Sequence, residues 1–190
     1  MNAGSSVSAR LADLALLAML TGIAAILTIA MGLQYASGEI PCPLCLLQRV
    51  AMFGICFGII RHIRHGYDGR NIGVSLVWSL FLLTVAVRQV LLNIVARPGH
   101  AYPGSAVLGL HMPVWSVLIA FAILLALAAT LTVFDGQRLR ATPPSPLLKR
   151  IGTSAAVYVI LLGLINLVSA VLQCGLGACH TTGYALLGSA

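Results

Sequence analysis

The sequence predicts an all-α, polytopic membrane protein: a four-helix transmembrane bundle with a fifth, C-terminal transmembrane helix. Of its 190 residues, 59% are hydrophobic and only 8% are charged, and the mean hydropathy is +1.01. A soluble domain of this length could not bury so much apolar surface. Long apolar runs also alternate with short polar segments, and no internal repeat divides them. We therefore expect residues 1–190 to form a single membrane domain.

Five apolar runs are long enough to be membrane spans. A helix rises about 1.5 Å per residue, so a hydrocarbon core of about 30 Å needs roughly 20 apolar residues. The first run is longer than the core of a signal peptide and has a single flanking arginine, so we expect an uncleaved span. A tail, residues 173–190, follows the last run. The predicted spans are 11–35, 45–60, 72–95, 114–134 and 151–172.

The basic residues predict the orientation of these spans. If the chain crosses five times, eight of the eleven lysines and arginines fall on one side: Arg10, Arg61, Arg64, Arg70, Arg138, Arg140, Lys149 and Arg150. The positive-inside rule then predicts a cytoplasmic N-terminus and an outer-face C-terminus. Because these residues lie in short segments rather than in one patch, the net charge of +7 reflects topology, and we expect no nucleic-acid partner.

A C-x-x-C motif precedes the second apolar run, in the segment Pro41-Cys42-Pro43-Leu44-Cys45-Leu46-Leu47-Gln48-Arg49. The free N–H groups and the positive dipole at a helix start favour a thiolate, so this position suits redox chemistry. Arg49 follows Cys45 by four residues, on the same helical face, where its charge favours a thiolate further. Alternatively, the two cysteines are half of a zinc site, and Arg49 is an interfacial anchor whose charged end reaches water.

The predicted topology places four of the five cysteines on the outer face, where disulfides are permitted: Cys42, Cys45, Cys174 and Cys179. Cys56 lies eleven residues beyond Cys45, inside a span, and is expected to be a small packing residue. Two classes of function follow from this placement. The cysteines are redox-active pairs, or together with His180 they form an outer-face four-cysteine metal site in a binding or transport protein.

Three segments resemble the disulfide bond formation protein B (DsbB) family. They are the cysteine motif, Arg88-Gln89-Val90-Leu91-Leu92 in the third span, and Leu108-Gly109-Leu110-His111-Met112-Pro113-Val114-Trp115 at the entrance of the fourth. The resemblance implies a bacterial inner-membrane thiol:quinone oxidoreductase. Such a protein reoxidises a periplasmic thiol oxidase of the DsbA type and passes the electrons to ubiquinone or menaquinone from the membrane pool. On this pattern Cys42 and Cys45 match the quinone-coupled pair, and Arg49 matches the arginine beside the quinone.

The chain departs from the family pattern in its second outer loop. The best-known members carry there a second cysteine pair that receives electrons from the partner, whereas residues 96–113 contain no cysteine. The chain has instead a fifth span and a tail with Cys174 and Cys179. We expect the tail pair to take the place of the loop pair and to exchange with Cys42 and Cys45. The alternative is that the tail disulfide is only a structural staple.

Two further residues are candidates for quinone binding. Arg88 is ionisable and lies inside a span, which marks it either as a functional residue or as a snorkelling anchor. His111 stands at the entrance of the fourth span, where it either hydrogen-bonds a quinone carbonyl or is an ordinary interface histidine. His180, next to Cys179, is expected to be a solvated tail residue.

Overall fold

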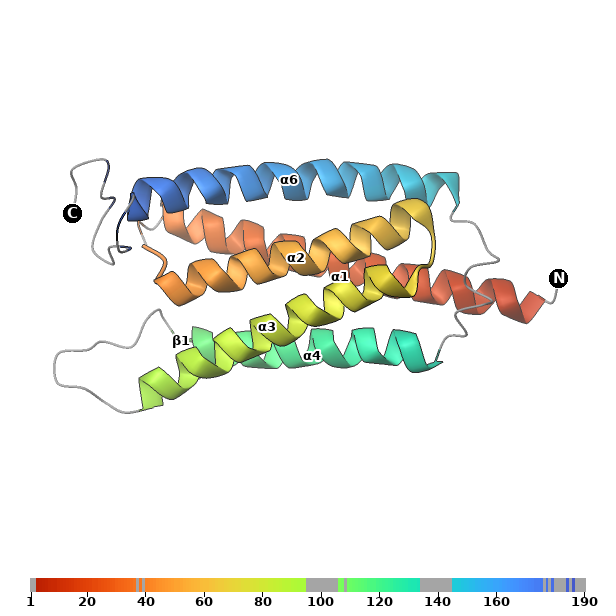
Figure 1. The fold of residues 1–190 in the computed structure, drawn as a ribbon, viewed down its shortest axis with the longest axis horizontal. Coiled ribbons are helices and arrows are strands. Elements are labelled where there is room, and N and C mark those ends of the chain that lie inside the picture. Colours follow the sequence, from red (N-terminus) through yellow and green to blue (C-terminus); the bar gives the residue numbers. More distant parts are fainter. Residues whose placement is uncertain are drawn as a thin grey trace.

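The computed structural model describes residues 3–36, 38, 40–94, 106–107, 109–133, 145–175, 177, 179, 184 and 186. Within these residues, five helices are long and apolar enough to cross a membrane, which confirms the predicted fold class (Figure 1). They are α1 (Ala3–Ala36), α2 (Pro43–His65), α3 (Gly69–Ile94), α4 (Met112–Val133) and α6 (Pro146–Cys174). Two antiparallel strands of two residues each, β1 (Ala106–Val107) and β2 (Leu110–His111), form a short hairpin that leads directly into α4.

Two helices begin before their apolar runs, because a capping residue followed by proline starts each of them. Cys42 caps α2 and its Sγ accepts the N–H of Cys45, while Ser145 caps α6 and its Oγ accepts the N–H of Leu148. Proline at the first helical position costs little, since that N–H has no partner within the helix. α2 also continues beyond residue 60 to His65. The predicted span ends at residues 95 and 134 lie outside the described residues.

Helix α2 lies at the centre of the bundle. It packs against α1, α3 and α6, and α4 packs on the far side of α3 (Figure 1). The contact with α3 is close at Gly58, where a Cβ would collide with Ser75 Oγ and with the carbonyl of Asn71. Ser75 Oγ donates to the carbonyl of Ile55 at 2.9 Å across this contact. Small residues at a membrane helix crossing allow such an approach.

The core of the bundle is apolar and includes Cys56, which is a free, buried cysteine as the sequence predicts. α2 and α4 begin, and α1, α3 and α6 end, at the same end of the bundle (Figure 1). We call this the cysteine end, because the C-x-x-C motif and Cys174 both lie there. That residues 1–190 are a single domain, with residues 173–190 as an outer-face tail, stays a prediction.

Candidate active site

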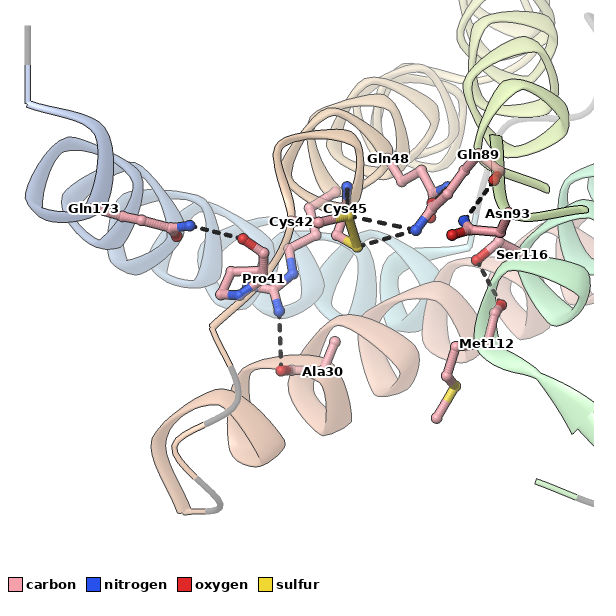
Figure 2. Close-up of a disulfide and its surroundings, with 11 residues drawn as sticks. Ala30, Pro41, Cys42, Cys45, Gln48, Gln89, Asn93, Met112, Ser116 and Gln173 are labelled. Carbon is pink, nitrogen blue, oxygen red and sulfur yellow. Dashed lines mark hydrogen bonds between the residues drawn. A yellow bond between two sulfur atoms is a disulfide. The ribbon is translucent and has the colours of Figure 1, made fainter. Parts of the chain in front are cut away.

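Cys42 and Cys45 form a disulfide at the start of α2 (Figure 2). Cys42 stands between Pro41 and Pro43, and a residue before proline is restricted to extended conformations; its φ is −67° and its ψ is 158°. This conformation makes Cys42 the N-cap, with its sulfur over the first helical turn. Both cysteines are partly exposed, so the disulfide is open to an attacking thiol.

The side chain in hydrogen-bonding contact with both sulfurs is the amide of Gln89, from α3. Its Nε2 lies 3.4 Å from Sγ of Cys42 and 3.4 Å from Sγ of Cys45 (Figure 2). Gln48 Nε2 donates to Gln89 Oε1 at 2.6 Å, and this bond orients the amide with its N–H groups toward the sulfurs. Both glutamines are buried. An N–H donor beside a sulfur favours the thiolate that forms when the disulfide opens.

Gln89→Leu should therefore leave less thiolate on the reduced Cys42–Cys45 pair. A hydrogen bond to a charged group is worth about 1.5–3 kcal/mol, so we expect alkylation by iodoacetamide at neutral pH to slow roughly 10-fold. The rate is measured in a background with Cys174→Ser and Cys179→Ser. Asn93→Leu is the matched control, because the Asn93 amide donates to the backbone carbonyl of Gln89 and to neither sulfur. Equal alkylation rates in Gln89→Leu and its parent would contradict the assignment.

Arg49 is buried behind the disulfide, only 7% exposed, and is held by uncharged acceptors. Its guanidinium donates to Gln34 Oε1 at 2.6 Å, to the carbonyl of Ala30 at 3.0 Å and to Asn166 Oδ1 at 3.4 Å. These acceptors come from α1 and α6. Because none of the three is a carboxylate, they hold the guanidinium in place without neutralising its charge. The charge stays available to a ligand, and Arg49 is not the exposed anchor considered as the alternative.

A cavity of about 510 Å³ joins the disulfide to Arg49. Its polar wall is formed by the two cysteines, Arg49, Gln48 and Gln89. Its apolar wall comes from α1 on one side and from the start of α4 on the other, with Ile26, Ile29, Leu33, Met112, Trp115 and Ile119 among the lining residues. Pockets of this size, apolar with a few polar groups at one end, are typical of sites for small organic molecules.

Two of the residues predicted to bind quinone, Arg88 and His111, do not line this cavity, and their role stays a prediction. Arg88 is exposed on α3 and does not line the cavity. Successive helical residues differ in direction by about 100°, so Gln89 takes the inward position instead. His111 lies in β2, partly exposed, and it is the next residue, Met112, that lines the cavity. The helical spacing of the buried residues Leu82, Val85, Ala86 and Gln89 is the signal that could have singled out Gln89.

The tail lies at the same end of the bundle as the C-x-x-C motif. Cys174 and Cys179 form a second disulfide. Gln173 Nε2 donates to the carbonyl of Pro41 at 2.7 Å (Figure 2). Farther along, the hydroxyl of Tyr184 accepts a hydrogen bond from Gln34 Nε2 at 3.0 Å. Two described residues of the tail, Gln173 and Tyr184, thus bind residues that line the cavity.

In this structure the four cysteines are paired with one another and are not gathered in the shared metal site considered as the alternative. They are joined in two separate disulfides, which removes the thiolates that zinc requires. Among the described residues, no three His, Cys, Asp or Glu side chains are grouped to hold a metal ion. His180 lies outside those residues.

Residues 12–101 match the family model of disulfide bond formation protein DsbB. This segment includes the C-x-x-C motif, Arg49 and Gln89, whereas α4, α6 and the tail lie beyond it. Neither the curated proteins nor the solved structures that were compared give a match. The match therefore covers α2, which carries the first disulfide and Arg49, and α3, which carries Gln89. Over residues 12–101, this chain with five potential membrane-spanning helices is therefore similar to the DsbB family of disulfide bond formation proteins.

Proposed function

We propose that the protein is a thiol:quinone oxidoreductase of the bacterial inner membrane. It reoxidises a periplasmic thiol oxidase of the DsbA type and passes the electrons to ubiquinone or menaquinone, which supports disulfide bond formation. The observation that carries this proposal is a single cavity whose wall holds both a disulfide and an arginine whose hydrogen-bond acceptors among the described residues are uncharged. The distribution of the basic residues supports a cytoplasmic N-terminus and a periplasmic C-terminus.

The residues of the cavity fit a quinone. Its volume of about 510 Å³ suits a ring with the first part of an apolar chain, and its walls from α1 and α4 are apolar. Gln48 and Arg49 supply N–H groups of the kind that a carbonyl oxygen accepts. A bound quinone supplies the acceptor for the two electrons that are released when a dithiol closes to a disulfide. Arg49 stabilises negative charge in the cavity, since its charge is already fixed in place before any reaction.

The two disulfides act in sequence. A thiolate of the reduced partner attacks the Cys174–Cys179 disulfide and leaves it as a dithiol, while the partner becomes oxidised. The tail dithiol then reduces Cys42–Cys45 through a mixed disulfide and returns to the disulfide state. We assign Cys42, next to Pro41, to exchange with the tail. Cys45, one helical turn from Arg49, is assigned to the quinone. Gln89 stabilises the thiolate in both steps.

Arg49→Ala tests the quinone site. We expect the apparent KM for quinone to rise roughly 10-fold or more, because a buried charge–ligand contact is worth at least about 1.4 kcal/mol. Exchange between the reduced partner and the oxidised protein should change little. Arg49→Lys should restore part of the function, since an ammonium group cannot reproduce the planar fork that contacts Gln34 and Ala30.

The measurement is the steady-state rate of quinone reduction by a reduced DsbA-type protein, as a function of quinone concentration. Arg88→Ala serves as the control, because it removes an arginine that is exposed and does not line the cavity. An unchanged KM for quinone in Arg49→Ala, with slower partner exchange, would refute the assignment of Arg49.

A further inference from the structure

One hydrogen bond connects the chain segments that carry the two disulfides. Gln173 is the last residue of α6 before Cys174, and Pro41 is the last residue before Cys42. Gln173 Nε2 donates to the carbonyl of Pro41 at 2.7 Å, across 132 residues of sequence (Figure 2). The side chain of Gln173 is fully buried, at 0% exposure, and Pro41 is also buried.

The Pro41 carbonyl needs a partner from outside α2. The first acceptor of α2 is the carbonyl of Cys42, which bonds the N–H of Leu46 at 3.1 Å, so Pro41 stands just before the helical ladder. A buried carbonyl left without a donor costs about 1–3 kcal/mol. Gln173 provides that donor, and its amide reaches across from α6, which lies beyond the residues that match the family model.

Helix α6 ends immediately after this contact. The N–H of Gly175 bonds the carbonyl of Val171 at 2.8 Å, and Gly175 has a positive φ of 57°, which suits glycine at a helix end. The chain therefore turns directly after Cys174, and the Cys174–Cys179 disulfide closes that turn. Gln173 holds the start of the turn against the Pro41–Cys42 segment.

We propose that Gln173 is a positioning residue for disulfide exchange between the two cysteine pairs. It holds Cys42 beside the end of α6, within reach of the tail thiols. This inference rests on the proposed function, since it requires that the tail pair (Cys174 and Cys179) passes electrons to the inner pair (Cys42 and Cys45). In the exchange, a tail thiolate forms a bond to Cys42 and breaks the Cys42–Cys45 bond. The second tail thiolate then displaces Cys42 and closes Cys174–Cys179.

The electrons and protons of this exchange balance without another reactant. The tail dithiol is oxidised to a disulfide by losing two electrons and two protons. The inner disulfide gains both electrons, and its two sulfurs take up two protons to become thiols. Gln173 takes no part in the bond changes. Its role is to keep the reacting sulfurs close to one another.

The test follows both pairs separately and needs no quinone. Full-length oxidised protein in detergent is mixed anaerobically with a small excess of a reduced DsbA-type protein and quenched at intervals with an alkylating agent. Peptide mass spectrometry then counts free thiols in each pair. In Gln173→Ala we expect the tail pair to be reduced at the wild-type rate and Cys42–Cys45 to be reduced at least 10-fold more slowly.

Ser169→Ala is the matched control. Ser169 is buried on the same helix, one turn before Gln173, and its hydroxyl bonds Tyr35 and the carbonyl of Ile165. This variant loses a buried hydrogen bond at α6 but touches neither cysteine pair. Both the first phase, reduction of the tail pair, and the second phase, reduction of Cys42–Cys45, should therefore keep wild-type rates. Gln173→Glu adds a pH readout. A neutral carboxyl group donates to the Pro41 carbonyl and a carboxylate cannot, so its rate relative to Gln173→Ala should rise as the pH falls.

The outcomes separate the two proposals. Wild-type reduction of Cys42–Cys45 in Gln173→Ala, or equal slowing of both phases, would overturn the positioning role alone. If the wild-type protein accepts no electrons on its tail pair, or passes none to the inner pair, the electron path in the proposed function fails whatever Gln173 does. Slowing confined to the second phase supports the proposal, because a general loss of structure would also disturb the first phase.

Discussion

Replacement of Cys42 or Cys45 by serine should abolish electron transfer from the reduced partner to quinone while the bundle stays folded. Neither variant can form the inner disulfide, and serine cannot take part in thiol exchange. Cys42→Ser keeps an N-cap side chain, since serine is among the preferred residues at that position, so we expect the stability to change by less than about 1 kcal/mol. Turnover is measured with reduced partner and added quinone, and folding by thermal unfolding followed by circular dichroism.

Cys56→Ala is the control for this prediction. It also removes one thiol, but Cys56 is buried in the core and is not paired. Its turnover should match the wild type, although the small core cavity that it leaves should lower the stability by about 1 kcal/mol. Wild-type turnover in either Cys42→Ser or Cys45→Ser would exclude a redox role for the inner pair.

Replacement of Cys174 or Cys179 by serine should stop oxidation of the partner and leave the inner pair competent. The reason is connectivity: the inner disulfide lines the cavity, and the tail disulfide is proposed to contact the partner. After reduction by dithiothreitol, Cys42 and Cys45 should still be reoxidised by added quinone. One of the two variants should accumulate a mixed disulfide with the partner, because the resolving thiol is missing.

A structural staple predicts the opposite pattern for these variants. Loss of a disulfide that only closes a short loop lowers the stability and leaves the partner kinetics normal. Steady-state oxidation of a reduced DsbA-type protein, together with a non-reducing gel, separates the two cases. Wild-type rates in both variants would rule out electron transfer through the tail.

Hydropathy was sufficient for the fold class, and local spacing was sufficient to place the first cysteine pair at a helix start, whereas spacing alone left both a redox pair and half of a zinc site open. Five apolar runs predict five long helices, because each run alone decides whether a helix can stand in a bilayer. The position of Cys42 and Cys45 at a helix start is likewise a local property, set by two prolines and a cap. The placement of Arg49 near the cysteine pair is also predictable from the sequence, since a residue four positions after Cys45 on the same helix shares its face.

Only the tertiary structure decided which side chains surround these residues. Gln89, Gln34, Asn166 and Gln173 are ordinary amides in the sequence, and each acts on a residue from 15 to 132 positions away. Helical periodicity places a residue on a face of its own helix but not opposite a given neighbour. For this reason the sequence singles out Arg88 by its charge, whereas it is Gln89 that faces the sulfurs, because its direction on the helix differs from that of Arg88 by about 100°. Amide partners depend on how helices cross, and the crossing is fixed by packing, as at Gly58 and Ser75.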